Sequence, residues 1–360
     1  CLLRSDDICE DSGPQTAELE QVEQKGQKFV VDRLKEEREL GHTIRTSINF
    51  FETSGRQYTL LDTPGKRKFI SKAIAGLSQA DIGILVVSAD KGVNETEIGK
   101  DGQTKEFIEL AYTMGISQLF VVINKMDINS IRYRRERLDR IERATSRVVR
   151  SYGFRRQIQF IPASASLGDN LSKRSLNTAW YDGSTLLEAL DSTIFRPKAE
   201  KPLHFSVLES FDIAGEGVVA VGKVLYGEID EKTVVNVAPE GLNCMVESIE
   251  MNHQRISQAR VGDFVGLLLS GLTSRDVKRG YVISSTFKPA QAVTSFKGRL
   301  VVINLPGREN IRQGFCPVLH VHTLRIACRF QTLMELVSQD GSLLTRNPTS
   351  LAPGQQAVVE

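Results

Sequence analysis

Two short segments of the sequence combine residue types that suit nucleotide binding, and each directly follows an expected strand. Segment 62–65 (Asp-Thr-Pro-Gly) offers a carboxylate that can hold a magnesium ion through water, and a glycine that lets a backbone N–H approach a phosphate. Segment 124–127 (Asn-Lys-Met-Asp) offers Asp127, whose carboxylate can accept hydrogen bonds from the N1–H and 2-amino groups of guanine. Adenine presents an acceptor at the first position and no donor at the second, so a site built on Asp127 would favour guanine.

Three further residues could complete such a site. Thr43, in segment 37–44 (Glu-Arg-Glu-Leu-Gly-His-Thr-Ile), has a hydroxyl that can ligate magnesium and an N–H that can reach a terminal phosphate. Asn124 can tie neighbouring loops together, and the aliphatic stem of Lys125 can lie along the plane of a base.

Taken singly, each pattern also has an ordinary structural explanation. Segment 62–65 could be a strand-ending turn, 124–127 a surface loop, and 37–44 a helix end with a glycine stop. Their order along the chain, followed by 164–166 (Ser-Ala-Ser) after another strand, is the order of a GTPase domain and favours the chemical interpretation.

The elements that must position these residues alternate between short apolar strands and amphipathic helices. Strands are expected at 47–52, 57–62, 82–88, 119–124 and 158–162, and helices at 103–114, 132–152 and 184–191. Continuous apolar runs such as 82–88 are typical of strands covered on both faces. Strands that alternate with helices predict a parallel α/β sheet.

The pattern changes at 195–202, where Pro197 and Pro202 lie among lysines and indicate an interdomain linker. Beyond it, short strands alternate with glycine-rich turns, which is typical of antiparallel barrels. These strands are expected at 218–226, 233–238, 245–251, 264–270, 300–304 and 317–323. A second boundary is expected near 288–295.

Composition narrows the classes of function. Lys and Arg number 46 and Asp and Glu number 44, so the net charge of +2 excludes a uniformly basic or acidic protein and leaves room only for local patches. No apolar run approaches the ~18–20 residues of a membrane helix, and no secretory leader is found. The five scattered cysteines form no CxxC pair and favour a reducing, cytoplasmic setting. Because residue 1 is Cys, we expect the sequence to begin inside a longer chain.

With these motifs in order, the chain resembles the eukaryotic-type translation elongation factor 1-alpha family over nearly its whole length. The GTPase part fits at 32–44, 51–53, 78–81, 102–104, 124–127, 168–170, 185–191 and 201–203. The barrel part fits at 215–227, 246–251, 262–263, 276–280, 306–307, 317–319, 322–323 and 326–328.

The resemblance implies an α/β P-loop-type GTPase domain, with a parallel-rich sheet and helices on both faces, followed by two antiparallel β-barrel domains. The domains would span 1–196, lacking the first strand and phosphate loop, then 203–287, and then 292–360 as the N-terminal part of the last barrel. The implied activity is hydrolysis of GTP to GDP and phosphate, coupled to delivery of aminoacyl-tRNA to the ribosomal A site. The implied partners are aminoacyl-tRNA, the ribosome and a guanine-nucleotide exchange factor, for a monomeric cytoplasmic protein that binds neither membranes nor DNA.

The resemblance also assigns roles to individual residues. The guanine ring would be read and supported by Asn124, Lys125, Asp127, Ser164, Ala165 and Ser166. Mg²⁺ and the terminal phosphate would lie against Thr43, Asp62, Pro64 and Gly65, with Thr43 and Asp62 serving the metal. Lys66 occupies the catalytic position of a family histidine that orients the attacking water, and Thr43 would also act in catalysis.

The sequence departs from the family pattern at two places that concern phosphate binding and hydrolysis. The phosphate-binding pattern GxxxxGK[ST] does not occur in the sequence, so we expect the 360-residue chain to bind GTP weakly by calorimetry. A lysine ammonium only donates hydrogen bonds, whereas a neutral imidazole can accept one from water. Lys66 therefore predicts slowed hydrolysis, unless its charge stabilises the transition state.

The sequence departs from the family pattern at two further places, Ser166 and segment 127–152. Ser166 replaces a family tryptophan near the guanine ring, which removes a packing surface. Segment 127–152 carries an unusual number of arginines, which the sequence places on several faces of one helix: Arg132, Arg134, Arg135, Arg137, Arg140, Arg143, Arg147 and Arg150. This helix is either solvated, with nearby acidic partners, or an RNA or ribosome contact whose affinity would fall with salt.

Three functions therefore stay open from sequence. The first is a magnesium-dependent GTPase elongation factor. The second is a diverged paralogue with weak GTPase activity in termination, ribosome rescue or specialised delivery. The third is a nonenzymatic tRNA-, ribosome- or cytoskeleton-binding protein that keeps the fold.

Overall fold

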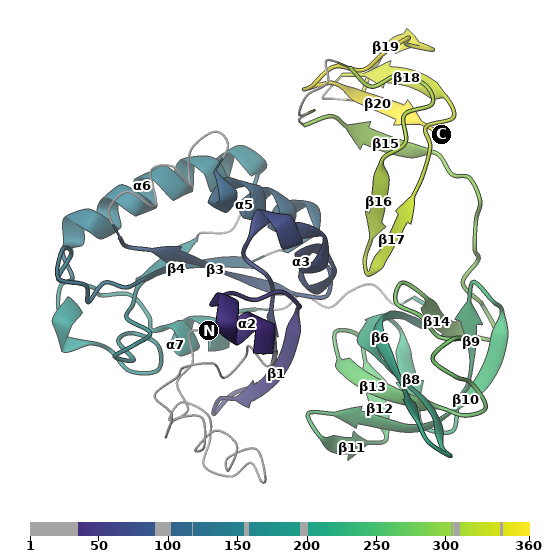
Figure 1. Cartoon of the computed structure of the whole chain (residues 1–360), viewed down its shortest axis with the longest axis horizontal. Coiled ribbons are helices and arrows are strands. Elements are labelled where there is room, and N and C mark those ends of the chain that lie inside the picture. Colours follow the sequence, from purple (N-terminus) through teal and green to yellow (C-terminus); the bar gives the residue numbers. More distant parts are fainter. Residues whose placement is uncertain are drawn as a thin grey trace.

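The computed structural model describes residues 35–90, 102–116, 118–154, 158–194, 201–303, 305, 310–338 and 341–360, which form three units in chain order (Figure 1). The first unit combines helices with a parallel sheet, the second is a β-barrel, and the third is a smaller antiparallel unit. The predicted fold class is thus confirmed. The domain boundaries 1–196, 203–287 and 292–360 remain predictions, and most of the expected linker 195–202 lies outside the described residues.

The first unit contains strands and helices close to the expected positions. Its strands are β1 (Ser47–Glu52), β2 (Gln57–Asp62), β3 (Ile82–Ser88), β4 (Gln118–Asn124) and β5 (Gln159–Pro162). Its α-helices are α2 (Lys35–Leu40), α3 (Ile70–Leu77), α5 (Gln103–Thr113), α6 (Arg135–Tyr152) and α7 (Leu186–Asp191), with short 3-10 turns at Arg67–Phe69 and Leu176–Thr178. Strands β3, β4 and β5 pair in parallel, whereas β1 and β2 form a separate antiparallel pair.

Strand β4 is buried on both faces because helices cover each side of the sheet (Figure 1). Val121 and Ile123 pack with residues of α6, and Phe120 and Val122 pack with residues of α7. Helix α7 begins with a reciprocal cap at Thr185, whose hydroxyl accepts from the N–H of Glu188 while the Glu188 carboxylate accepts from the N–H of Thr185. Strand β4 ends at Asn124, the first residue of segment 124–127.

Helix α6 starts three residues later than expected. Arg132 and Tyr133 have φ values of 48° and 53°, in the left-handed region that a right-handed helix cannot include. The helix ends at Gly153, whose φ of 94° makes it a left-handed cap. The expected start at 132 was therefore wrong, because the preceding loop uses these residues to turn.

The second unit is an antiparallel barrel around one apolar core. Its longer strands are β6 (His204–Ile213), β7 (Gly217–Tyr226), β9 (Val234–Ala238), β10 (Leu242–Met251), β13 (Phe264–Leu269) and β14 (Val282–Ser285). Short strands β8 (Glu228–Asp230), β11 (Gln254–Ile256) and β12 (Gln258–Arg260) complete it. The main sheet has the order β11-β10-β13-β7-β6-β14-β9, and β9 also pairs with β10, which closes the sheet on itself.

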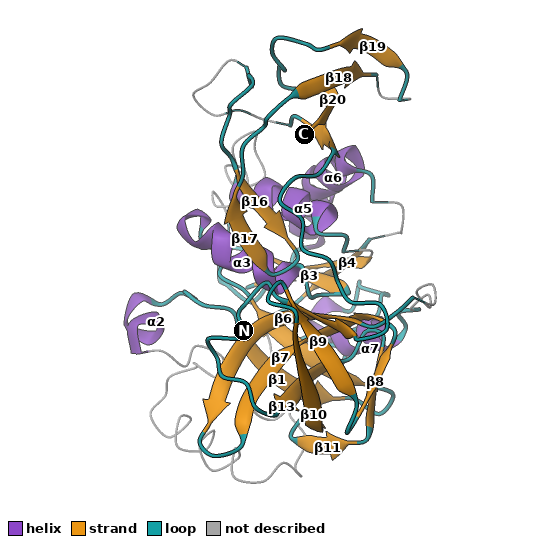
Figure 2. Ribbon diagram, turned by 90° about the vertical axis from the view of Figure 1, so that its right-hand side faces the viewer, coloured by secondary structure: helices purple, strands orange, loops and turns teal. Residues whose placement is uncertain are grey.

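The third unit forms a four-stranded sheet and a protruding hairpin. The sheet has the order β15-β20-β18-β19, from β15 (Gly298–Val301), β20 (Gln356–Val359), β18 (Leu333–Val337) and β19 (Leu343–Arg346). The hairpin of β16 (Val318–Val321) and β17 (Leu324–Ala327) reaches toward the barrel (Figures 1 and 2). At its tip the Thr323 hydroxyl donates to the carbonyl of Val207 at 2.6 Å, so this turn ties the third unit to the second.

The first unit contacts the barrel through both apolar and charged groups. Ala75 packs with Leu208 and Phe264 of the barrel. The buried Lys223 of β7 donates to the Asp81 carboxylate at 2.6 Å and to the carbonyl of Gln79 at 2.7 Å. None of the described helices combines the length and apolar character required to cross a bilayer.

Candidate functional site

The side chain of Glu37, in helix α2, holds the loop that carries Thr43 in place. Glu37 is 3% exposed, and its Oε1 accepts from the N–H groups of Ile44 at 2.8 Å and Arg45 at 2.9 Å. The Thr43 hydroxyl lies 3.4 Å from the Asp62 carboxylate at the end of β2. The structure therefore brings together the two residues expected to serve the metal. Sequence reasoning gave Glu37 no role, because its burial depends on how the loop folds back over the helix.

The segment after β2 continues as a loop through Pro64 and Gly65. Pro64 is buried and Gly65 is exposed, and no atom lies within 4 Å of where a Cβ on Gly65 would be. The Gln103 side chain at the start of α5 donates to the carbonyl of Gly65. The open space beside Gly65 is what close approach of a phosphate to this backbone requires.

Lys66 lies at the edge of this loop, against His42 of the Thr43 loop. Lys66 Nζ is 3.2 Å from His42 Nδ1, and the same nitrogen is 2.8 Å from the carbonyl of Leu40. One ring nitrogen serves only one of these contacts at a time, so the ammonium and the carbonyl compete for it. The His42 ring also stacks on Phe69 with centroids 5.8 Å apart. Lys66 is thus placed between the two phosphate-side loops.

At the end of β4, Asn124 joins two loops that are far apart in sequence. Its Oδ1 accepts from the N–H of Lys125 at 2.7 Å and from the N–H of Ala165 at 2.9 Å. Lys125 adopts a φ of 65°, a conformation that costs a side-chain-bearing residue about 1–2 kcal/mol. The geometry agrees with the expectation that Asn124 ties neighbouring loops together.

Asp127 and Ser166 meet where those two loops converge. The Ser166 hydroxyl donates to Asp127 Oδ2 at 3.3 Å and lies 3.0 Å from the hydroxyl of Ser164. In the described part of the chain no other hydrogen-bond donor reaches Asp127, so its second oxygen is open for a ligand. Ser166, which replaces a family tryptophan, therefore contacts the carboxylate expected to read the base.

A second layer of contacts behind Asp127 was not expected from the sequence. The Tyr133 hydroxyl donates to the Asp169 carboxylate, and the Trp180 indole donates to the carbonyl of Tyr133 at 2.9 Å. Burial and the hydrogen bond to Asp169 raise the pKa of Tyr133 well above its usual value, so this hydroxyl stays protonated. A tyrosine just after the 124–127 motif is a weak signal by itself, because nothing in the sequence identifies a partner 36 residues away.

The residues expected to bind a nucleotide therefore gather into two groups. The guanine-side group consists of Asn124, Lys125, Asp127, Ser164, Ala165 and Ser166. The phosphate-side group consists of Thr43, Asp62, Pro64, Gly65 and Lys66. The first offers an open carboxylate, which suits donors on a base, and the second pairs a hydroxyl with a carboxylate, which suits a hard cation such as Mg²⁺.

In comparisons with known proteins, two family models match this chain, one in its first part and one in its last part. The Elongation factor Tu GTP binding domain matches residues 5–196, and the Elongation factor Tu C-terminal domain matches residues 289–360. The elongation factor 1-alpha of Hyperthermus butylicus is 40% identical over 350 residues, which cover 95% of this chain and 79% of that protein. The elongation factor 1-alpha of Entamoeba histolytica is 41% identical over 338 residues, covering 92% of this chain and 75% of that protein.

A solved structure agrees in fold. The GTPase-like domain of S. cerevisiae Ski7, bound to GDP and inorganic phosphate, superposes with a TM-score of 0.71 at 20% identity, over 98% of this chain and 83% of that one. At that identity the likeness concerns the fold alone. Together with the family matches across the first and third units, these findings show that the chain belongs to the elongation factor Tu/elongation factor 1-alpha family of translational GTPases.

Proposed function

We propose that this protein delivers aminoacyl-tRNA to the ribosomal A site in a GTP-dependent manner, with hydrolysis of GTP to GDP and phosphate. The observation that carries the proposal is the junction at Asn124, which orders the Asp127 loop and the Ser164–Ser166 loop around one open carboxylate. Similarity to elongation factors 1-alpha over 95% of the chain supports the translational role. Aminoacyl-tRNA, the ribosome and an exchange factor are the partners of this proposal, for a monomer in the cytoplasm.

Asp127 supplies the guanine specificity in this proposal. Its open oxygen, together with the one that Ser166 contacts, can accept from two adjacent N–H donors of guanine. Lys125 is exposed beside it, and its aliphatic stem can cover one face of the ring. Adenine would leave the carboxylate without these donors, which is costly in a desolvated site.

The phosphate side would bind Mg²⁺ through the Thr43 hydroxyl and, directly or through water, the Asp62 carboxylate. When bound, the ion neutralises charge on the terminal phosphates. The open space beside Gly65 lets its backbone approach the terminal phosphate, and Glu37 holds the Thr43 loop in place. These residues bind and orient the substrate.

A second candidate function is that of a diverged paralogue with slow hydrolysis. Lys66 favours it, because its ammonium lies 3.2 Å from His42 Nδ1 and cannot accept a hydrogen bond from an attacking water. In that case the protein would bind GTP and RNA as a long-lived complex. If the GTP-loaded protein protects the ester of aminoacyl-tRNA from hydrolysis, that result supports delivery, whereas GTP binding without protection supports the paralogue.

The Asp127→Asn substitution tests the base assignment. Asparagine offers one acceptor oxygen and an amino group that only donates, so we expect GTP affinity to fall about 10²-fold while xanthosine triphosphate, with a carbonyl in place of the 2-amino group, gains affinity. Competition against a fluorescent nucleotide measures both. If the preference for GTP over xanthosine triphosphate is unchanged, Asp127 does not contact the base.

A further inference from the structure

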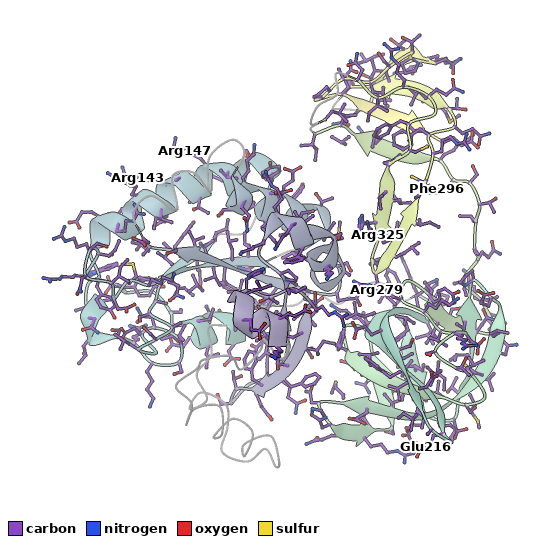
Figure 3. All side chains as sticks on the ribbon, in the orientation of Figure 1. Arg143, Arg147, Glu216, Arg279, Phe296 and Arg325 are labelled. Atoms are coloured by element: carbon purple, nitrogen blue, oxygen red, sulfur yellow. The ribbon has the colours of Figure 1, made fainter. Side chains whose placement is uncertain are left out.

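Four arginines of α6 form one continuous stripe on the outer face of the first unit. With 100° per residue, Arg140, Arg143, Arg147 and Arg150 fall within an arc of about 80° on the exposed side of the helix. Figure 3 shows Arg143 and Arg147 pointing away from the protein. The rise of ~1.5 Å per residue makes the stripe about 15 Å long, with guanidinium groups about every 5 Å along the helix.

The opposite face of α6 anchors this stripe. Leu138, Ile141 and Val149 are buried against the sheet. Arg137 is also buried, donating to the carbonyls of Ala89 at 2.7 Å and Asp90 at 2.6 Å. The arginines thus have different roles, and the stripe projects from a helix that is packed along its length.

The charges of three members of the stripe, Arg143, Arg147 and Arg150, are available to a ligand. In the described part of the chain, no carboxylate lies within ion-pair distance of Arg143, Arg147 or Arg150. Arg143 and Arg147 each use Nε on a helix carbonyl, at 3.0 and 3.3 Å, which directs the remaining guanidinium N–H groups outward. The acidic Asp139 and Glu142 turn to the side, where they line a cavity of about 400 Å³ with Trp180 and Tyr181.

The composition of the stripe indicates the partner. All six cations of α6 are arginine, and a planar guanidinium binds phosphate through two parallel hydrogen bonds in a way that lysine cannot. An interfacial membrane helix needs an exposed apolar face, but the apolar face of α6 is buried. Recognition of single strands relies on aromatic stacking, and the stripe presents no aromatic residue.

We propose that Arg140, Arg143, Arg147 and Arg150 form a docking surface for the phosphate backbone of duplex RNA, separate from the nucleotide site. Only the choice of RNA over DNA rests on the proposed translational function. With a net charge of +2 for the whole chain, binding of this kind has to come from a local array such as this one.

The test measures binding of a fluorescent duplex RNA of about 16 base pairs to the 360-residue chain by anisotropy, from 50 to 200 mM salt. Each phosphate contact adds about 0.9 to the slope with which log affinity falls against log salt concentration. Four contacts therefore predict that affinity falls on the order of 10²-fold over this range. Replacing all four arginines by glutamine should lower the slope by about 3–4, whereas replacing them by lysine should keep most of the slope and weaken binding. Circular dichroism melting confirms that each variant is folded.

The matched control removes four exposed cations elsewhere by substituting glutamine for Lys288, Lys297, Arg312 and Arg329. An equal loss in this control would mean that binding follows net charge, and would overturn the proposal. So would stripe-dependent binding to phosphatidylserine vesicles without stripe-dependent binding to RNA. Because GTP is not present, failure of the nucleotide-binding experiments leaves this result interpretable.

Discussion

The two halves of the candidate site are held in different ways. The guanine side rests on the buried parallel sheet β3–β4–β5 and is cross-linked internally, since Asn124 binds the N–H groups of both Lys125 and Ala165. The phosphate side stands on the separate pair β1–β2, and its loop is held chiefly by Glu37 from a short helix. The loops expected to bind the base are therefore cross-linked to each other without a ligand, whereas the loop expected to bind phosphate has fewer such contacts.

Lys66→His should give the largest effect and acts on the phosphate side alone. A neutral imidazole at this position can accept a hydrogen bond from the attacking water, so we expect single-turnover GTP hydrolysis to rise about 10²-fold or more, with affinity little changed. Rates are compared with and without ribosomes. Lys68→His, two residues further on in the 3-10 turn Arg67–Phe69, is the control that changes another exposed lysine. Equal rates for the unsubstituted protein and the Lys66→His variant would show that this position does not limit hydrolysis.

Asn124→Ala should disrupt the contact that joins the two loops of the guanine-side group. It leaves two backbone N–H groups without their acceptor, at about 1–3 kcal/mol each, so we expect affinity for GTP and GDP to fall together by about 10²-fold. Displacement of a fluorescent nucleotide measures both. The exposed Asn129→Ala, from the same loop, should leave affinity unchanged. A loss for GTP without one for GDP would contradict the assignment of this junction to the base.

Glu37→Ala should instead lower the affinity for GTP without lowering the affinity for GDP. The Thr43 loop loses two hydrogen bonds to a buried carboxylate, so we expect GTP affinity to fall about 10-fold while GDP, which lacks the terminal phosphate, keeps its affinity. The exposed neighbour Glu36→Ala serves as the control. If GDP affinity fell as much as GTP affinity, the two halves would not be separable in the way the structure indicates.

Ser166→Ala should give the smallest effect. Its hydroxyl contributes one hydrogen bond of 3.3 Å to Asp127, worth about 0.5–1.5 kcal/mol, so affinity for guanine nucleotides should fall about threefold. The exposed Ser130→Ala is the control. A tenfold or greater loss would mean that Ser166 positions Asp127 more firmly than one such contact explains.

Much of the first unit could be predicted from local sequence. The strand that ends at Asp62 and the strand that ends at Asn124 were expected within a residue of their observed bounds, because a short apolar stretch followed by polar turn residues marks the end of each. The start of α6 was missed, because left-handed backbone at Arg132 and Tyr133 is set by the loop's contacts and not by residue type. The division of the α6 arginines into a buried Arg137 and an exposed stripe likewise required the packed helix.

The sequence by itself determined which elements form and where along the chain the nucleotide-binding residue types occur, since both depend on short-range hydrophobic pattern and residue chemistry. Only the tertiary structure decided which of those residues meet. Ala165 reaches Asn124 across 41 residues, Ser166 reaches Asp127 across 39, and Lys66 reaches His42 across 24. Such contacts arise from how the strands and loops pack in three dimensions, and no spacing along the chain encodes them.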